Sequence, residues 1–418
     1  TNFFRNFKFF YGKISELSDS QLNSIAKSIT DNCEVIEIKS WQVEQAITMF
    51  NSLNSDGLPL YDSDIISAKL YAEAEKRGKE KEFADLWKQL NNCINELEST
   101  RIADINSILM QYMYYIRTVN KETISETGAI NVTTPGLRRY FTEVNKMPIT
   151  DPIGMCSDMV KLVKVWKKVS EYPQMKVLLK FNENTKLFLA SYFFRFDEDN
   201  ITEELVEPIL ECLLRLFSLL ELVDVGYSSK YFKTFLFGAE VKLVSKSTTV
   251  DAITQDFNEH IRSNWDKETI WAALHDYDGN VLVYLNEFLF AKEKGLSFTL
   301  GTKYDIEHIM PYSGNNLQEI RKDAEIDSEE EFYGVVNKLG NKILLEEKIN
   351  RAIGNEWFRT KVSTKLENKT GYIDSKYPIA RALVSKYQSA NKPYWKKDDI
   401  MSTTDKASDR IVSFIFGE

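Results

Sequence analysis

Apolar residues recur along most of the chain at the three- and four-residue spacing of amphipathic helices. The clearest periodic stretches are 81–119, 158–196, 203–225 and 266–294, and each predicts helix. Residues 227–247 fit either a helix or a strand, and we favour the helix. Residues 122–134 are polar and precede Pro135-Gly136, which predicts a linker. The pattern therefore predicts a mainly α protein.

The apolar run 209–225 is interrupted by Glu211, Arg215, Glu221 and Asp224, so it predicts a core helix and no membrane span. The four cysteines (Cys33, Cys93, Cys156 and Cys212) are scattered without metal-ligand spacing. They argue against structural zinc and against a disulfide framework. No signal peptide is visible. Reduced thiols in a cytoplasmic protein, without a membrane partner, are the expectation.

The pattern changes near residue 298. Residues 298–309 alternate loosely and predict a strand pair or a strand end, which Pro311 terminates. The acidic stretch 312–331 predicts a surface loop, with a short helix as the alternative. Residues 342–345 predict a second strand, and residues 350–366 predict a helix that begins at Asn350. We therefore expect a small α+β element, with the arrangement strand, loop, strand, helix, carried by a multi-helical body.

Candidate chemistry gathers on this element. Glu307 and His308 are adjacent in Asp-Ile-Glu-His-Ile-Met-Pro, Asn341 lies in Leu-Gly-Asn-Lys-Ile-Leu-Leu, and Asn350 follows nine residues later. Taken singly, a Glu-His pair usually marks a strand end, an Asn after Gly a turn, and an Asn before Arg a helix cap. In combination they form the skeleton of an HNH nuclease site. The other two histidines, His260 and His275, have no companion motif and are interpreted as surface or helix-packing residues.

Each residue type suits one step of phosphodiester hydrolysis. His308 can take a proton from water, because an imidazole titrates near neutral pH. Glu307 and Asn350 offer hard oxygen ligands for one Mg²⁺ or Mn²⁺ ion. Asp305, on the same strand face as Glu307, is expected to be an auxiliary ligand or a group that holds a ligand in place. Asn341 is expected to fix the loop or the imidazole. Arg351 is expected to help the metal stabilise the charge that develops on the phosphate.

The formal net charge of −9 does not favour nucleic acid, but its distribution does. Residues 336–397 hold 14 Lys and Arg against 5 Asp and Glu, so the rest of the chain carries about −18. Such residues can simply solvate helix faces. We favour DNA contact, because Lys348, Arg351, Arg359 and Lys361 flank the predicted site, with Arg351 and Arg359 expected on one face of a single helix.

These motifs, with Asn-Arg-Ala-Ile-Gly-Asn, Phe358 and Lys361, resemble the C-terminal nuclease half of GmrSD-type restriction enzymes, which are modification-dependent (type IV) anti-phage endonucleases. The resemblance implies a ββα-metal (His-Me finger, HNH) domain that hydrolyses DNA. The chain departs from the family pattern at Lys342 and Ile343, where Leu-Thr is usual, and at Tyr312, where Gln is usual. None of these positions is expected to hold metal.

Residues 46–65 carry an Ala-x-x-x-Phe-x-x-Leu-Asn-x-x-Gly pattern that resembles the end of the family's N-terminal ParB-like domain. A plain helical hairpin is the alternative. Asp62 or Ser63 is expected to cap the helix that follows. The family's Asp-Gly-Gln-Gln-Arg motif does not occur, so we expect a C-terminal fragment, or a chain without its N-terminal region. Nucleotide binding is expected only when that region is present.

We expect three regions: 1–120, the helical end of the ParB-like domain; 121–250, a helical middle; and 251–418, the nuclease domain. The expected function is metal-dependent endonucleolytic cleavage of DNA, with modified phage DNA as the candidate substrate. Two alternatives are a nuclease-inactive DNA-binding or sensor protein and an RNA-directed nuclease. The intact set of four site residues argues against the first, and the family resemblance argues against the second. The modification recognised, the cut pattern and the choice between monomer and homodimer remain open.

Overall fold

The computed structural model describes residues 2–33, 61–97, 102, 104–223, 229–363, 370–389 and 392–417. The chain divides into two compact units, Thr1–Leu60 and Tyr61–Glu418, which are described separately. The first contains α1 (Asn2–Ser15) and α2 (Asp19–Asn32). The motif at residues 46–57, which carries the ParB-like resemblance, lies outside the described residues.

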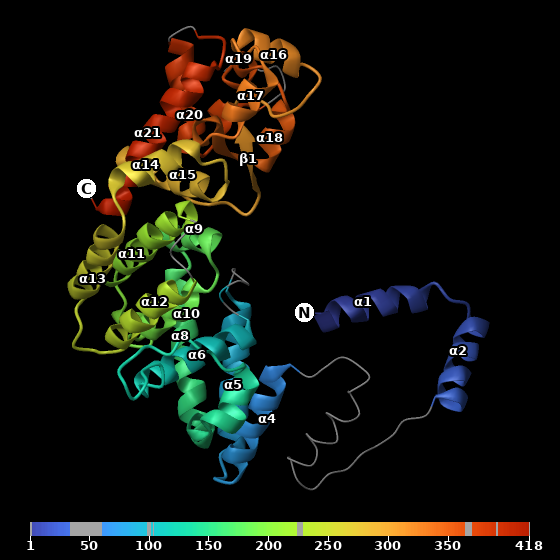
Figure 1. The fold of residues 1–418 in the computed structure, drawn as a ribbon. Coiled ribbons are helices and arrows are strands. Elements are labelled where there is room, and N and C mark those ends of the chain that lie inside the picture. Colours follow the sequence, from blue (N-terminus) through green and yellow to red (C-terminus); the bar gives the residue numbers. More distant parts are fainter. Residues whose placement is uncertain are drawn as a thin grey trace. The chain divides into compact units, whose positions relative to one another are not determined.

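The second unit begins with a helical body (Figure 1). Its first part contains α4 (Asp62–Glu75), α5 (Glu80–Asn95), α6 (Ile105–Val119), the short α7 (Leu137–Arg139), η1 (Tyr140–Val144) and η2 (Met147–Thr150), α8 (Pro152–Val169), α9 (Pro173–Phe181), α10 (Thr185–Phe193) and η3 (Glu198–Asn200). Helix α5 packs on α8, and α6 packs on α10. Tyr61 is the N-cap of α4, so the expected cap at Asp62 or Ser63 is wrong, because both residues already lie in the helix.

The body continues with α11 (Glu203–Leu222), α12 (Ser229–Leu243), α13 (Val250–Asn264), α14 (Lys267–Asp276) and α15 (Val281–Glu293). The helix favoured for 227–247 is confirmed by α12. Several predicted helices are interrupted. Residues 81–119 form two helices, and 158–196 belong to three, because Pro173 begins α9. Residues 277–280 separate α14 from α15.

The small sheet follows the body. Strand β1 (Tyr304–His308) pairs antiparallel with β2 (Lys342–Glu346), with Glu307 opposite Ile343 and His308 opposite Lys342. Between them lie α16 (Leu317–Asp323), α17 (Glu329–Val336) and η4 (Leu339–Asn341); after them come α18 (Glu347–Ile353), α19 (Phe358–Lys361), η5 (Tyr372–Asp374), α20 (Pro378–Ser389) and α21 (Lys397–Phe416). The prediction of a mainly α fold with a small α+β element is confirmed.

The predicted helix 350–366 is wrong in its bounds. Helix α18 begins at Glu347, so Asn350 lies within it, and it ends at Gly354, whose φ of +53° is unfavourable for other residues. Phe358 then starts the separate helix α19. Arg351 and Arg359 therefore do not share one helix face. The acidic stretch 312–331 contains α16, which was the alternative to a loop.

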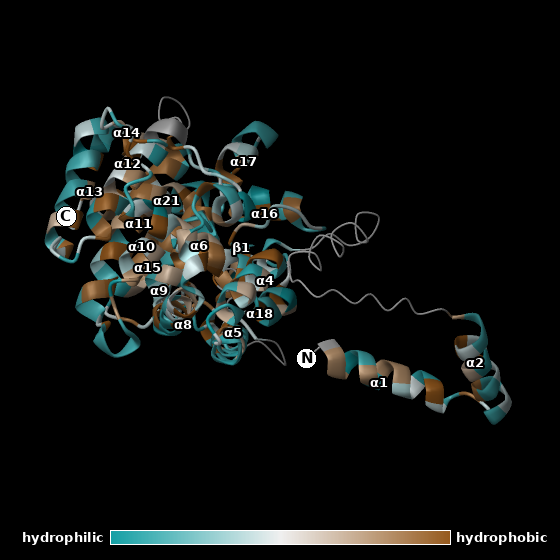
Figure 2. Cartoon of the chain, turned by 90° about the horizontal axis from the view of Figure 1, so that it is seen from below, coloured by the Kyte–Doolittle hydropathy of each residue, from teal (hydrophilic) through white to brown (hydrophobic). Residues whose placement is uncertain are grey.

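Two apolar cores hold this unit together. The larger runs through the helical body and includes Leu344 of β2 and Ile411 of α21. The smaller surrounds the hairpin and contains Ile309, Phe332 and Ile343. In Figure 2, hydrophobic segments face the interior of the packed helices, while exposed turns are hydrophilic. The hairpin is therefore fixed on both sides by buried apolar contacts.

Among the described residues, no helix is long and apolar enough to cross a membrane. The four cysteines are free, and Cys156 and Cys212 are buried. Burial raises the pKa of both thiols, which makes them poor nucleophiles.

Candidate active site

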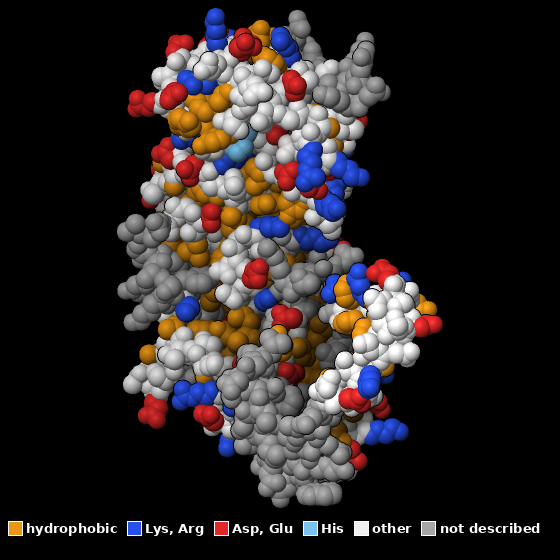
Figure 3. All heavy atoms as spheres, turned by 90° about the vertical axis from the view of Figure 1, so that its right-hand side faces the viewer, with side chains coloured by type: hydrophobic (Ala, Val, Ile, Leu, Met, Phe, Trp, Pro, Cys, Tyr) orange, Lys and Arg blue, Asp and Glu red, His pale blue; other side chains and the backbone are white. Residues whose placement is uncertain are grey.

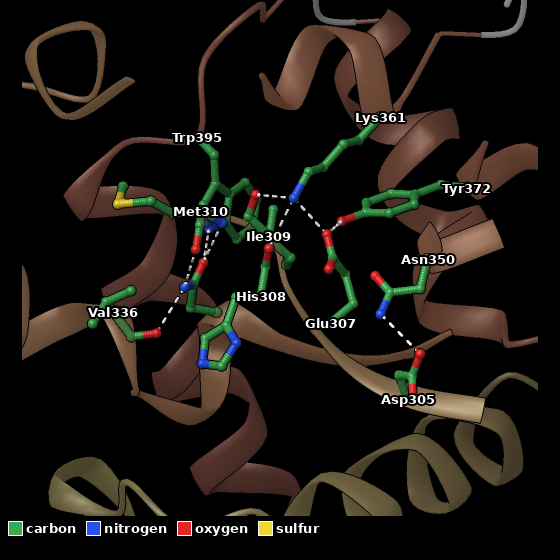
Figure 4. Close-up of polar contacts among 11 residues, drawn as sticks. Asp305, Glu307, His308, Ile309, Met310, Val336, Asn350, Lys361, Tyr372 and Trp395 are labelled. Atoms are coloured by element: carbon green, nitrogen blue, oxygen red, sulfur yellow. Dashed lines mark hydrogen bonds and ion pairs between the residues drawn. The ribbon is translucent and has the colours of Figure 1, made fainter. Parts of the chain in front are cut away.

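The candidate site lies at the end of β1 and along the start of α18 (Figure 4). Successive strand residues point to opposite faces, so Asp305 and Glu307 share one face of β1 and His308 takes the other. Glu307 is 6 % exposed, whereas His308 is half-buried at the strand end. Figure 4 shows the His308 ring pointing away from the Glu307 carboxylate.

Glu307 is held through one of its two carboxylate oxygens. Lys361 Nζ lies 2.5 Å from Glu307 Oε1, and the Tyr372 hydroxyl donates to the same oxygen at 3.0 Å. Lys361 and Tyr372 are fully buried. Burial lowers the pKa of Lys361, against the opposing effect of Glu307, and raises the pKa of Tyr372. Among the described residues, Glu307 Oε2 has no hydrogen bond.

Lys361 also donates to the carbonyl oxygens of His308, at 2.9 Å, and Ile309, at 3.2 Å. It therefore joins the Glu307 carboxylate to the backbone of His308 and of the residue that follows it. This placement contradicts the expectation that Lys361 contacts phosphate, because its ammonium group is enclosed and all three of its donors are engaged.

Asn350 faces β1 from α18. Its Nδ2 donates to Asp305 Oδ2 at 3.0 Å. The bond fixes the orientation of the amide and leaves its oxygen, Oδ1, without a hydrogen bond among the described residues. In this structure Asp305 therefore orients the Asn350 amide through a hydrogen bond.

His308 has one ring nitrogen engaged. His308 Nε2 lies 3.1 Å from Oδ1 of Asn337, which follows α17. An amide oxygen can only accept, so Nε2 carries the proton and Nδ1 has the free lone pair. Burial lowers the pKa of the ring, and Lys342 and Lys361 lower it further, while the Asn337 bond opposes the shift. The neutral imidazole is thus the favoured form.

Asn341 is fully buried and ties the two strands together. Its Oδ1 accepts from the backbone N–H of Met310 at 2.8 Å and from Trp395 Nε1 at 3.1 Å. Its Nδ2 donates to the carbonyls of Met310, at 3.0 Å, and Val336, at 2.8 Å. The backbone N–H of Ile309 donates to the Asn341 carbonyl. These bonds fix the turn that directly follows His308.

Of the cations expected to contact DNA or phosphate, Lys348, Arg351 and Arg359 are exposed. The Arg351 side chain is 76 % exposed and forms an ion pair with Glu347 one turn earlier. Arg359 lies over the Trp357 ring at 5.5 Å. Among the described residues, no hydrogen bond joins the His308 ring to Glu307, Asn350 or Arg351.

The hairpin and helix thus hold a histidine, a carboxylate and an amide in a region that matches a family model. Residues 248–407 match the model of the C-terminal domain of the GmrSD restriction endonucleases. The match covers α13 to α20 in full and all the candidate site residues. It supports a GmrSD-type assignment of this region, nuclease activity and DNA as the substrate. No curated protein matches the chain.

The GmrSD-like region has a donor set suited to one hard divalent cation. Glu307 Oε2 and Asn350 Oδ1 are oxygen donors without hydrogen bonds among the described residues, and a carboxylate with an amide oxygen is typical of Mg²⁺ and Mn²⁺ sites completed by water. Among the residues that the structure describes, no cluster of three or more His, Cys, Asp or Glu occurs. A metal held by Glu307 and Asn350 would therefore need water at its remaining coordination positions.

Two functional candidates in the GmrSD-like region, Asn337 and Tyr372, escaped the sequence analysis, and a third, Lys361, was expected in another role. Asn337 has no distinguishing motif and is identified only by its contact with His308. Tyr372 resembles any core aromatic. Lys361 carried a usable signal: it lies three residues after Phe358, so both occupy one face of α19, and both are buried.

Proposed function

We propose that this chain is a metal-dependent DNA endonuclease with an HNH-type site, acting in the restriction of phage DNA that carries modified bases. The observation that carries this proposal is the arrangement around His308. The ring stands at the end of a two-stranded hairpin, has its Nε2 committed to Asn337, and belongs to the same strand–strand–helix unit as Glu307 and Asn350. The similarity to restriction endonucleases supports cleavage of DNA.

His308 is the general base in this proposal. With the proton on Nε2, the free Nδ1 can take a proton from a water molecule that attacks phosphorus. Asn337 keeps this tautomer and orients the ring, as outer partners of catalytic histidines do. Because burial lowers the pKa of His308, the ring is unprotonated and ready to accept a proton at neutral pH.

Glu307 and Asn350 would hold the metal. Lys361 and Tyr372 occupy Glu307 Oε1, so the carboxylate presents Oε2 alone. Asp305 occupies the Asn350 nitrogen, so the amide presents its oxygen. A bound Mg²⁺ or Mn²⁺ supplies a Lewis acid that stabilises negative charge on the phosphate and on the leaving 3′ oxygen.

The remaining residues position these groups or the substrate. Asn341 holds the backbone of Met310, and Lys361 holds that of His308, so the base keeps its place relative to the carboxylate. Arg351 is exposed and can approach the phosphate when Glu347 releases it. Lys348 and Arg359 are exposed and can contact neighbouring phosphates.

Cleavage of a supercoiled plasmid and of phage DNA with modified bases, each under titration with Mg²⁺ and with Mn²⁺, tests this proposal. We expect cutting that EDTA abolishes. Glu307→Gln and Asn350→Ala should shift the titration to higher metal concentration, with part of the lost rate recovered there. Glu319→Gln, an exposed carboxylate on α16, should leave the titration unchanged.

Cutting in EDTA, or an unshifted titration for both site variants, contradicts the proposal. An RNA of the same sequence, assayed in parallel, shows whether the protein prefers DNA or RNA as its substrate. Faster cleavage of the RNA than of the DNA would replace the DNA substrate by RNA.

A further inference from the structure

Two tyrosines stand beside the proposed base. The ring of Tyr312, just after β1, has its centroid 6.1 Å from that of His308. Tyr333 on α17 lies 6.2 Å from Tyr312. Tyr312 is 47 % exposed and Tyr333 is 57 % exposed. Among the exposed aromatic residues that the structure describes in Tyr61–Glu418, these two are the pair whose rings contact each other.

Both tyrosines pack against one buried side chain, Phe332. Phe332 is 1 % exposed, and its ring lies 5.3 Å from Tyr333 and 6.4 Å from Tyr312. Arg321 covers Phe332 at 5.2 Å. The tyrosines therefore rest on the hairpin core and still present much of their surface to solvent. Figure 3 shows exposed histidine atoms, in pale blue, bordering a patch of hydrophobic side chains.

The first turn of α17, the helix that carries Tyr333, is acidic. Helix α17 begins with three glutamates, and Glu329 and Glu330 are exposed. The exposed cations expected to contact DNA, Lys348, Arg351 and Arg359, lie on α18 and α19, beyond β2 in sequence. Arg321 lies over the buried Phe332 ring, and the two tyrosines present aromatic surface to solvent, which suits an uncharged planar group.

We propose that Tyr312 and Tyr333 form a stacking subsite for an unpaired nucleobase next to the scissile phosphate. This inference rests on the proposed function. The 6.1 Å from His308 to Tyr312 is less than two base-pair steps of about 3.4 Å each, so a neighbouring base can reach the ring. A base must leave its duplex stack to lie on these rings. Because every base has a π face, the subsite tolerates any sequence and selects unpaired bases.

Binding without cleavage tests the subsite. Fluorescence anisotropy in EDTA gives the affinity for a single-stranded oligothymidylate and for a duplex of equal length. We expect Tyr312→Ala and Tyr333→Ala each to weaken single-strand binding by about tenfold, with duplex binding changed less than about twofold. Tyr312→Phe and Tyr333→Phe should keep the affinity, because stacking needs the ring and not the hydroxyl.

Tyr71→Ala is the matched control, since Tyr71 is 38 % exposed on α4. It should change neither affinity. Single-strand affinity unchanged in both alanine variants, equal losses on single strand and duplex, or no single-strand binding by the parent protein would each overturn the subsite. Because the assay needs no metal and no cutting, a failed nuclease proposal would appear separately as absent plasmid cleavage.

Discussion

Asn337 determines which nitrogen of His308 can act. Its amide oxygen accepts from Nε2, so Nδ1 alone has a lone pair for a proton. Replacing Asn337 by Leu removes the acceptor. The proton of His308 can then lie on either ring nitrogen, and the ring can rotate. We expect the kcat for DNA cleavage to fall about 10–100-fold, the usual range for such outer partners.

The affinities for metal and DNA should stay unchanged in Asn337→Leu, because Asn337 contacts neither in the proposed site. Asn92→Leu, on an exposed face of α5, is the matched control and should cleave like the parent. An Asn337→Leu protein with parental kcat would show that the Asn337 bond has no catalytic role.

A substitution of Lys361 shows whether this side chain contacts phosphate or forms a buried ion pair with Glu307. Lys361→Met leaves the Glu307 carboxylate buried without its cation, and breaking such a pair costs about 3–5 kcal/mol. The free energy of unfolding from urea titration should fall by about this amount. Lys348→Met, at an exposed position of α18, should lower it by less than about 0.5 kcal/mol.

If Lys361→Met keeps the parental stability and loses affinity for all DNA sequences alike, the sequence-based expectation of a DNA contact would be correct. Such a result would mean that Lys361 reaches solvent and contacts phosphate.

The residue types at the site could be predicted from sequence, but several of their partners could not. Glu307, His308 and Asn350 were singled out by adjacency and spacing. Asp305 was expected to assist the metal, and its observed contact is with Asn350. Partners such as Asn337 and Tyr372 come from distant segments, and only the folded chain brings them to the hairpin.

At the scale of elements, η4 and α21 meet at Gly340. A Cβ built on Gly340 would lie 2.3 Å from the Ile400 carbonyl oxygen and 2.4 Å from the Thr404 nitrogen, both backbone atoms of α21. The Gly340 N–H also donates to Thr404 Oγ1 at 3.1 Å. Gly340→Ala must separate η4 from α21, and Asn341 moves with η4.

We expect Gly340→Ala to lower the free energy of unfolding by about 1–3 kcal/mol and to reduce cleavage. Gly334, within α17, has nothing within 4 Å of its built Cβ. Gly334→Ala should therefore be neutral or stabilising. Thermal melts of the two variants provide the comparison, and equal melting temperatures would argue against the close approach at Gly340.

The existence of the helices was predictable, whereas their ends were less so. Apolar periodicity continued through breaks such as that between α14 and α15, because the buried faces of both helices carry similar residues. The break at Gly354 was overlooked for a different reason: a glycine inside a periodic run can be tolerated or can end a helix, and its positive φ decides.

For the whole molecule, the net charge of −9 coexists with a basic stretch at residues 336–397. If exposed cations there grip phosphates, the log–log plot of DNA affinity against salt should have a slope of about −0.9 for each contact. Lys348→Gln and Arg359→Gln should each reduce the slope by about one and weaken binding to all sequences alike.

Lys88→Gln on α5 is the matched control for these two variants and should leave the slope unchanged. A salt-independent affinity, or a slope that only the Lys88 variant alters, would remove DNA binding from this part of the chain.

The cleavage rate of His308→Ala, measured on plasmid at saturating Mg²⁺ with and without added imidazole, tests the central claim most directly. The variant keeps Glu307 and Asn350 but lacks the base. The account predicts a loss of at least about a hundredfold with metal and DNA affinity retained, and partial recovery when imidazole enters the vacated space. His275→Ala, on α14, should cut like the parent. Cleavage by His308→Ala at the parental rate would contradict the account.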